Sequence, residues 1–242
     1  MTLSTEQNAL LALIDRAYAA QNEWVAGLSD AERELVGTPE RWSAKDMLAH
    51  ITFWQQVMID RLNMVRRGET PTLFGDFQPV NERIFDERNA HSWQQVRDEA
   101  AAAYAAAGEH VRTFDTATLT ERDRFAWNHN EPLVSNILSN SYWHPLEHAA
   151  RFAIERGDNA HAIALMDDAI VNEPALAVFP HDRATALFNL ACLYATTGLP
   201  AQALALLPES FALRPDLIEW SKQDSDLDSI RDTPEFQELV GK

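Results

Sequence analysis

Residues 141–174 read SYWHPLEHAARFAIERGDNAHAIALMDDAIVNEP and combine two patterns in one stretch. His144 and His148 are four residues apart, so on a helix both side chains project from the same face, one turn apart. From Ala150 onward, small residues, a glycine and a final proline follow the spacing of a helical hairpin repeat. The stretch therefore predicts a helix that carries a histidine pair and continues into a repeat.

The hairpin pattern occurs a second time, so that residues 150–174 align with residues 191–215. The second copy follows the tetratricopeptide spacing of a leucine, small residues, a tyrosine, a turn glycine and a closing proline. The identical pairs are Ala150 and Ala191, Gly157 and Gly198, Ala160 and Ala201, Ala162 and Ala203, Ala164 and Ala205, and Pro174 and Pro215. Two alanine-rich helices can match by composition alone, but the aligned glycines and prolines favour a repeat.

Before the repeat, the hydrophobic spacing is helical almost throughout, and alternating strand patterns are nearly absent. We expect a short helix over residues 80–89 and long helices over 5–28, 43–67, 92–114 and 132–156. Four long helices predict an all-α fold that begins with an up-down four-helix bundle. We therefore expect the bundle over residues 1–157, and tetratricopeptide-like hairpins with a C-terminal capping helix over 158–242. The fourth bundle helix is expected to serve also as the first helix of the first repeat.

The net charge of −17 argues against nucleic acid or an anionic membrane as a partner. Residues 1–157 carry 15 Lys and Arg against 23 Asp and Glu, whereas residues 158–242 carry 5 against 14. The N-terminus lacks a basic stretch before an apolar run, and no apolar run is long enough to span a bilayer, so we expect a cytoplasmic protein. The single cysteine, Cys192, lies in an apolar run and is expected to be a buried structural thiol.

His50 is a third candidate, because it lies on the inward face of the expected second helix, near Ile51 and Trp54. A buried imidazole without a partner is costly there. The spacing is compatible with two arrangements. In the first, His50, His144 and His148 converge on a metal ion and leave one coordination position open, as in catalytic zinc sites. In the second, each histidine forms a hydrogen bond to a neighbour of its own.

Two stretches match known helix signatures. Residues 42–54 are WSAKDMLAHITFW, and residues 142–148 are YWHPLEH. They resemble W-S-x-K-D-x-L-A-H-x-x-x-W and Y-x-H-x-x-E-H, the second-helix and fourth-helix motifs of the DinB-like metal-binding four-helix bundles, in particular of their DfsB/ClbS-type branch. The resemblance covers residues 5–157. It implies a divalent metal ion, Zn²⁺, Ni²⁺ or Fe²⁺, held by His50, His144 and His148.

Proteins with this fold include thiol-dependent transferases and isomerases, metal-dependent hydrolases and a self-resistance protein that acts on a reactive electrophile. The resemblance therefore implies an enzyme, either a hydrolase or a transferase with a low-molecular-weight thiol as cosubstrate, that acts on a small electrophilic substrate. Pro145 departs from the pattern, because it removes a backbone donor between the two histidines. In a helix that begins near Tyr142, Pro145 falls in the first turn and costs little. In a helix that begins near residue 132, it is expected to cause a kink that can re-aim His144.

Two acidic residues near the expected site each have two interpretations. Glu147 is a candidate catalytic residue, as a general base or as a group that orients a ligand, but it also suits an i,i+4 surface pair with Arg151. Asp46 lies one turn before His50, yet Ser43 and Asp46 also form a capping-box-like helix start, which explains Asp46 more simply. The stretch FAWNHNEP, residues 125–132, suits either the mouth of a pocket or a helix-entry loop capped by Asn130.

A different class of function is also compatible with the sequence. In a non-catalytic adaptor, the hairpins bind a partner protein, the bundle is a scaffold, and the acidic residues 158–242 favour a basic partner. An adaptor does not need three histidines around an open coordination position, so the metal site distinguishes the two classes. Self-association into a homodimer is a further expectation.

Overall fold

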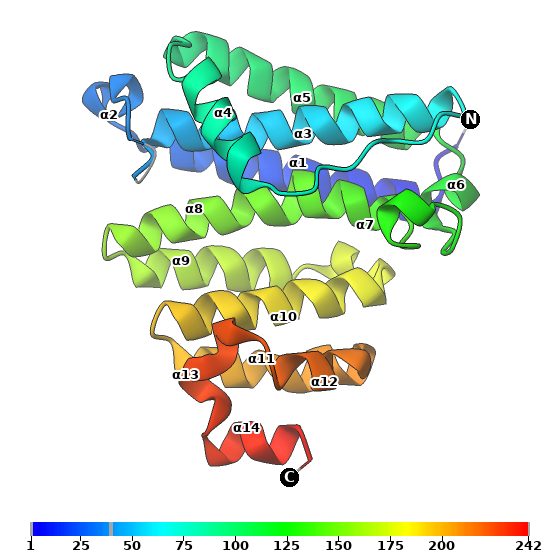
Figure 1. Cartoon of the computed structure of the whole chain (residues 1–242), viewed down its shortest axis with the longest axis vertical. Helices are drawn as coiled ribbons and strands as arrows, with labels where there is room; N and C mark the ends of the chain where they lie inside the picture. Colours follow the sequence, from blue (N-terminus) through cyan, green and yellow to red (C-terminus); the bar gives the residue numbers. More distant parts are fainter. Residues whose placement is uncertain (1, 39–40, 242) are drawn as a thin grey trace. The chain divides into compact units, whose positions relative to one another are not determined.

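The computed structural model describes residues 2–38 and 41–241. Within these residues the chain is helical, and its only β-interaction is an isolated bridge between Thr38 and Arg41, which confirms the prediction of an all-α fold. The chain divides into two compact units, Met1–Phe152 and Ala153–Lys242, and the division falls inside helix α8 (His144–Glu155; Figure 1). None of the described helices is long and apolar enough to cross a membrane.

The first unit contains four long helical segments. Three are single helices, and the fourth consists of a short helix, a π-helical turn and α8. Their bounds are α1, Thr5–Ala26; α3, Ala44–Arg66; α5, Trp93–Thr113; and α7, Leu133–Leu138, followed by the π-helical turn Ser139–Trp143 and α8. The shorter connecting helices are α2, Asp30–Glu34; α4, Gln78–Arg88; and α6, Thr116–Thr120. Each predicted helix is therefore present, with ends that shift by one or two residues.

The three long single helices begin in the same way, at a serine whose hydroxyl accepts a hydrogen bond from the backbone N–H three residues later. The side chain of that later residue accepts a hydrogen bond from the N–H of the serine. The pairs are Ser4 with Gln7, Ser43 with Asp46, and Ser92 with Gln95. Each capping box satisfies two backbone donors that a helix start leaves free, so the local sequence fixes where each helix begins.

The packing of the bundle places α3 beside the fourth segment. Helix α5 packs against both α1 and α3, and the fourth segment packs against the same two helices. Ala103 and Ala107 of α5 are buried, and such small side chains let helices approach closely. From the fourth segment, Ile137, Tyr142 and Leu146 are almost fully buried in the core. The face of α3 that carries His50 therefore meets the segment that carries the other two histidines.

The second unit contains α9, Asn159–Met166; α10, Pro180–Thr196; α11, Pro200–Leu213; α12, Asp216–Ser221; α13, Asp228–Arg231; and α14, Pro234–Leu239. A π-helical turn, Asp167–Val171, continues α9. Near the C-terminus, the side chains of Leu227, Ile230 and Phe236 are fully buried, so this acidic segment still contributes to the core of the unit.

The two aligned hairpins have the same local backbone conformation at their turns. Gly157 and Gly198 both adopt left-handed conformations, with φ of 80° and 81°. The residue after each glycine donates a hydrogen bond to the carbonyl five residues before it, at 2.9 Å to Ala153 and at 2.8 Å to Tyr194. This is the 6→1 hydrogen bond of a Schellman helix end, which needs a residue that tolerates positive φ. The turns are thus equivalent, while the tetratricopeptide assignment stays a prediction.

Candidate metal centre

His50 lies in the second turn of α3, and its side chain is 6% exposed. The ring of Trp42 packs against its imidazole with the ring centroids 4.6 Å apart, and Trp54 lies edge-on at 6.4 Å. Because the capping box of Ser43 fixes the start of α3, it also fixes the direction in which His50 projects about two turns later. His50 is therefore held in one orientation by aromatic neighbours and by its helix.

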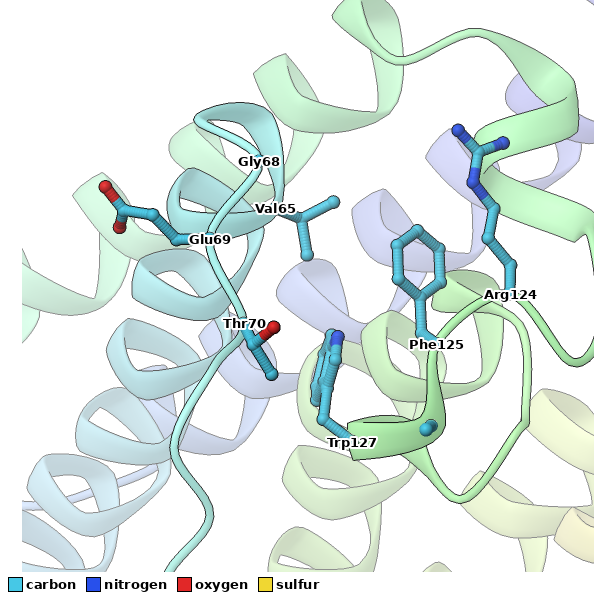
Figure 2. Close-up of a pocket in the computed structure, with 8 residues that line it drawn as sticks. Val65, Gly68, Glu69, Thr70, Arg124, Phe125 and Trp127 are labelled. Carbon is cyan, nitrogen blue, oxygen red and sulfur yellow. The ribbon is translucent and has the colours of Figure 1, made fainter.

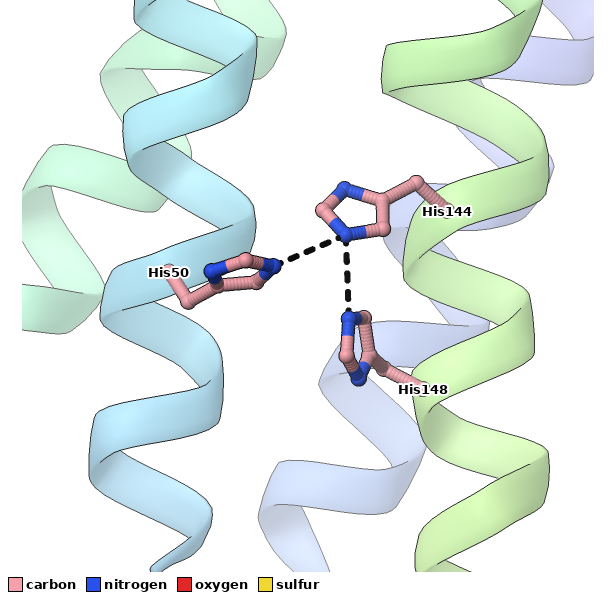
Figure 3. A group of neighbouring side chains, drawn as sticks. All are labelled: His50, His144 and His148. Carbon is pink, nitrogen blue, oxygen red and sulfur yellow. Dashed lines mark hydrogen bonds between the residues drawn. The ribbon is translucent and has the colours of Figure 1, made fainter. Parts of the chain in front are cut away.

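The fourth helical segment contains a π-helical turn directly before the helix that carries Pro145. The segment does begin near residue 132, and the backbone N–H of His144 donates to the carbonyl of Ser139, five residues earlier. A proline ring crowds the preceding turn, and the wider π-helical turn gives the ring more room. Regular helix resumes at His144, and both histidines of α8 point toward α3 (Figure 3).

The three histidines meet at one point between α3 and α8. The Nε2 atom of His144 lies 3.1 Å from Nε2 of His50 and 2.9 Å from Nε2 of His148 (Figure 3). One ring nitrogen from each residue lies within 4.8 Å of the other two, although His50 and His144 are 94 residues apart in the chain. The structure thus brings together the three residues that the sequence singled out as metal ligands.

Burial makes the three imidazoles neutral at physiological pH. Burial, with smaller contributions from His144 and His148, lowers the pKa of His50 to about 2. Burial, assisted by His148, lowers the pKa of His144 to about 3. Burial, assisted by Arg151, lowers the pKa of His148 to about 4. Neutral imidazole is the form that binds a metal ion, so no proton has to leave before binding at neutral pH.

The three Nε2 atoms cannot all form good hydrogen bonds with one another. The Nε2 atom of a neutral imidazole offers either one proton or one lone pair, whereas Nε2 of His144 faces two other ring nitrogens. One of its two contacts therefore lacks a good hydrogen bond. A divalent cation that accepts a lone pair from each ring removes this conflict, and three nitrogen ligands suit Zn²⁺ and similar ions. The residues present fit a metal ion.

Glu147 and Asp46 both make the structural contacts that their simpler interpretations predicted. The Nε atom of Arg151 donates to Oε1 of Glu147 at 2.9 Å, and both side chains are partly exposed. Oδ2 of Asp46 accepts the hydrogen bonds of the α3 cap. Neither contact tests whether these carboxylates also act on the site.

Two aromatic residues near the site were missed by the sequence interpretation. Phe74 and Phe77 pack edge-on against Trp54, with ring centroids 5.6 Å and 5.4 Å apart. Phe77 is 57% exposed. Both belong to the connection between α3 and α4, where no hydrophobic periodicity indicates which side chains point inward.

A pocket of about 350 Å³ lies at the other end of α3 (Figure 2). Its lining includes Val65 and Thr70 on one side and Phe125 and Trp127 on the other. Val65 lies about 22 Å along the helix from His50, so this pocket is separate from the histidines. Of the loop 125–132, only Phe125, Ala126 and Trp127 line this pocket, and the pocket is not at the histidines.

The other interpretation of that loop, in which Asn130 caps the next helix, is wrong. The N-cap of α7 is Pro132, and no side chain forms a cap hydrogen bond there. Asn130 instead adopts a left-handed conformation with φ of 62°, as does His129 before it, with φ of 55°. Asparagine tolerates this conformation well, so its role in the loop is to turn the backbone.

A second group of potential ligands, Cys192, Asp224 and Asp226, occurs in the second unit. The Sγ atom of Cys192 donates to Oδ2 of Asp224 at a distance of 3.9 Å, and the thiol is buried. Burial, with the charges of Asp224 and Asp226, raises the pKa of this thiol well above its usual range. Cys192 therefore stays protonated, which agrees with the expected structural role and not with that of a nucleophile.

The fold and the site together define a helical bundle with an internal set of three potential metal ligands. The family model of the DinB superfamily matches residues 13–155, which is more than half of the chain and includes all three histidines. The chain therefore belongs to the DinB superfamily, whose members commonly bind metal. No curated protein and no solved structure matches the chain.

Proposed function

We propose that the chain is a metal-dependent enzyme in which His50, His144 and His148 hold a divalent cation, Zn²⁺, Ni²⁺ or Fe²⁺. The observation that carries this proposal is the meeting of three neutral Nε2 atoms at one partly buried point. Three protein ligands leave part of the coordination sphere open, as catalytic sites require. A cation bound there would lower the pKa of a bound water or thiol and so supply a nucleophile at neutral pH.

The substrate in this proposal is a small electrophile, and the reaction is a hydrolysis or a transfer to a low-molecular-weight thiol. The motifs at residues 42–54 and 142–148 support this choice through their resemblance to the DfsB/ClbS-type branch. Trp42 and Trp54 flank His50, and Phe77 extends this apolar surface. These rings suit the apolar part of a substrate, and they keep water away from the imidazole of His50.

Glu147 has a supporting role in the proposed reaction. It lies on α8 between the two histidines, and its carboxylate favours a positive charge on His144. The hydrogen bond from Arg151 holds its Oε1 atom in place. A carboxylate fixed in this way can orient a nucleophile or accept its proton.

The proposal is tested by the metal content of the full-length protein, purified without a tag and without chelators. We expect about one divalent ion per chain, as for other sites of this ligand type. The variants His50→Ala and His148→Ala should lose the metal, because two nitrogen ligands hold it far more weakly than three. His161→Ala is the matched control, since His161 is exposed and lies outside the site. Elemental analysis measures the content, and circular dichroism shows whether each variant is folded.

The opposite result is a folded protein that contains no metal and gains no stability from added Zn²⁺, Ni²⁺ or Fe²⁺. That result would overturn the enzyme proposal. It would favour the second candidate function, in which the hairpins bind a basic segment of a partner protein. The observation behind this candidate is the matched pair of glycine turns at Gly157 and Gly198, together with the acidic composition of residues 158–242. Stacked helical hairpins present a continuous surface to such partners.

A further inference from the structure

Asp46 is a buried carboxylate whose two oxygens have different environments. Its side chain is 6% exposed. Oδ2 accepts three hydrogen bonds, from the N–H of Gly37 at 2.7 Å, the N–H of Ser43 at 2.9 Å and the hydroxyl of Ser43 at 2.6 Å. A Cβ atom at Gly37 would lie 2.7 Å from Oδ2 and 2.5 Å from the N atom of Ser43, so this close approach needs a glycine. The orientation of the carboxylate is therefore fixed.

The other oxygen, Oδ1, is buried and has no hydrogen-bond partner among the described residues. The same is true of Nδ1 of His50, one helical turn further along α3. Side chains four residues apart on a helix lie on the same face and are close enough to interact. The cap accounts for Oδ2 alone, so it does not explain why a carboxylate with a second buried oxygen occupies this position.

The two unpartnered atoms are chemically complementary when His50 acts as a ligand. Nε2 of His50 is the atom that faces His144, so Nε2 must carry the lone pair. The proton of the neutral ring then lies on Nδ1, which becomes a buried donor in need of an acceptor. Oδ1 of Asp46 is a buried acceptor in need of a donor.

We propose that Asp46 is a positioning residue for His50. This proposal rests on the proposed function. One water molecule accepts the Nδ1 proton of His50 and donates to Oδ1 of Asp46, and this bridge selects the tautomer with the lone pair on Nε2. A carboxylate that accepts a proton from a metal-binding histidine fixes the tautomer and the ring orientation, and it raises the basicity of the ligand. The Ser43–Asp46 pair thus caps the start of α3, and Asp46 also orients the ring of the metal ligand His50.

The test compares two substitutions at Asp46 in the full-length protein. Asp46→Asn replaces the acceptor by an amide that can donate to Nδ1. Asp46→Glu keeps the charge and the usual capping-box partner of serine, so it preserves the fold while it moves the carboxylate. Ser43→Ala is the matched control, because it weakens the cap but leaves Asp46 held by the backbone donors of Gly37 and residue 43.

Two quantities are measured. Nitrogen-15 NMR of the metal-free protein reports which nitrogen of His50 carries the proton, and competition with a chelator gives the affinity for Zn²⁺. We expect the Nδ1–H tautomer in the wild type and in Ser43→Ala, with Zn²⁺ affinities within about threefold of each other. In Asp46→Asn and Asp46→Glu, the Nε2–H tautomer should gain population, and the affinity should fall by about 10–100-fold.

The inference is overturned if both Asp46 variants keep the Nδ1–H tautomer and the wild-type affinity, because Asp46 is then only a cap. A wild-type protein that binds no Zn²⁺ contradicts the proposed function instead. In that case the tautomer of His50 in the metal-free variants still decides whether Asp46 orients the ring.

Discussion

At the scale of single residues, the three histidines are costly to bury and gain little from one another. Each has a pKa far below the ordinary value of 6.5, mainly because burial disfavours the charged form. Groups with strongly shifted pKa values that share one place in a fold are typical of functional sites. The cost of keeping the histidines together indicates that their arrangement serves a purpose other than stability.

These pKa shifts predict that the metal-free protein loses stability in mild acid. In the unfolded chain the histidines bind protons below pH 6.5, whereas in the folded chain they stay neutral down to about pH 4 or lower. The unfolded state thus binds more protons in this window, and the free energy of unfolding falls as the pH falls. Each histidine contributes up to about 1.4 kcal/mol per pH unit.

Urea unfolding of the metal-free protein between about pH 7 and pH 5 measures this dependence. His148→Gln should reduce the loss of stability over that range by about 2 kcal/mol, because one titrating group is removed. If the variant and the wild type show the same pH dependence, His148 is not kept neutral by the fold.

At the scale of the elements, small departures from regular helix position the functional side chains. The π-helical turn before His144 lets Pro145 stay within the fourth segment while both histidines of α8 point toward α3. The capping box of Ser43 and Asp46 sets the start of α3 and hence the direction of His50. Turns of this kind are frequent at functional sites, because they re-aim side chains without breaking the helix.

The two hairpin turns give a prediction at the same scale. Gly157→Ala and Gly198→Ala should each lower the free energy of unfolding by about 1 kcal/mol, because alanine is strained at positive φ. The two losses should be similar, since the turns have the same hydrogen-bond pattern. Chemical denaturation measures them.

Gly75→Ala is the control for these variants: a Cβ atom meets no other atom within 4 Å there, as at the two turns, but Gly75 does not have a positive φ. Its effect should stay within about 0.5 kcal/mol. If only one of the two substitutions lowers the free energy of unfolding, the two turns do not contribute equally to stability. That result would weaken the case for a repeat.

At the scale of the whole molecule, the chain consists of two compact units with different compositions. The three histidines lie in the first unit, and the family match ends at residue 155, close to the division at residues 152 and 153. The second unit contains the two glycine turns and the whole of the acidic segment 158–242. The proposed chemistry and the proposed partner surface are therefore assigned to different units.

This division predicts a local response to metal. Addition of Zn²⁺ to the metal-free protein should slow amide hydrogen exchange in α3 and α8, because a ligand that binds only the folded site suppresses its local opening. Exchange in α10 and α11 should stay unchanged. Hydrogen-exchange mass spectrometry of the full-length protein measures both regions.

His50→Ala serves as the control for this experiment and should abolish the effect of Zn²⁺. Equal slowing of exchange in both units would contradict a local response, because it would mean that the units open together.

The sequence by itself determined the helices, their starts and the residues of the candidate site. Serine caps, helical periodicity and the glycine turns are local, so their effects are readable within one or two turns of chain. Local patterns were less informative in loops. They misassigned Asn130 as a cap, and they did not indicate that Phe74 and Phe77 pack against Trp54.

Only the tertiary structure decided whether the candidate ligands meet. The sequence left open whether His50, His144 and His148 converge or bind separate neighbours, because residues 94 positions apart come together only through packing. It also left open whether the helix that carries Pro145 begins near residue 132 or near Tyr142, and it did not indicate the π-helical turn before His144. Local interactions fix where a helix starts and which face is apolar, whereas the packing of α3 against the fourth segment decides which side chains share a point in space.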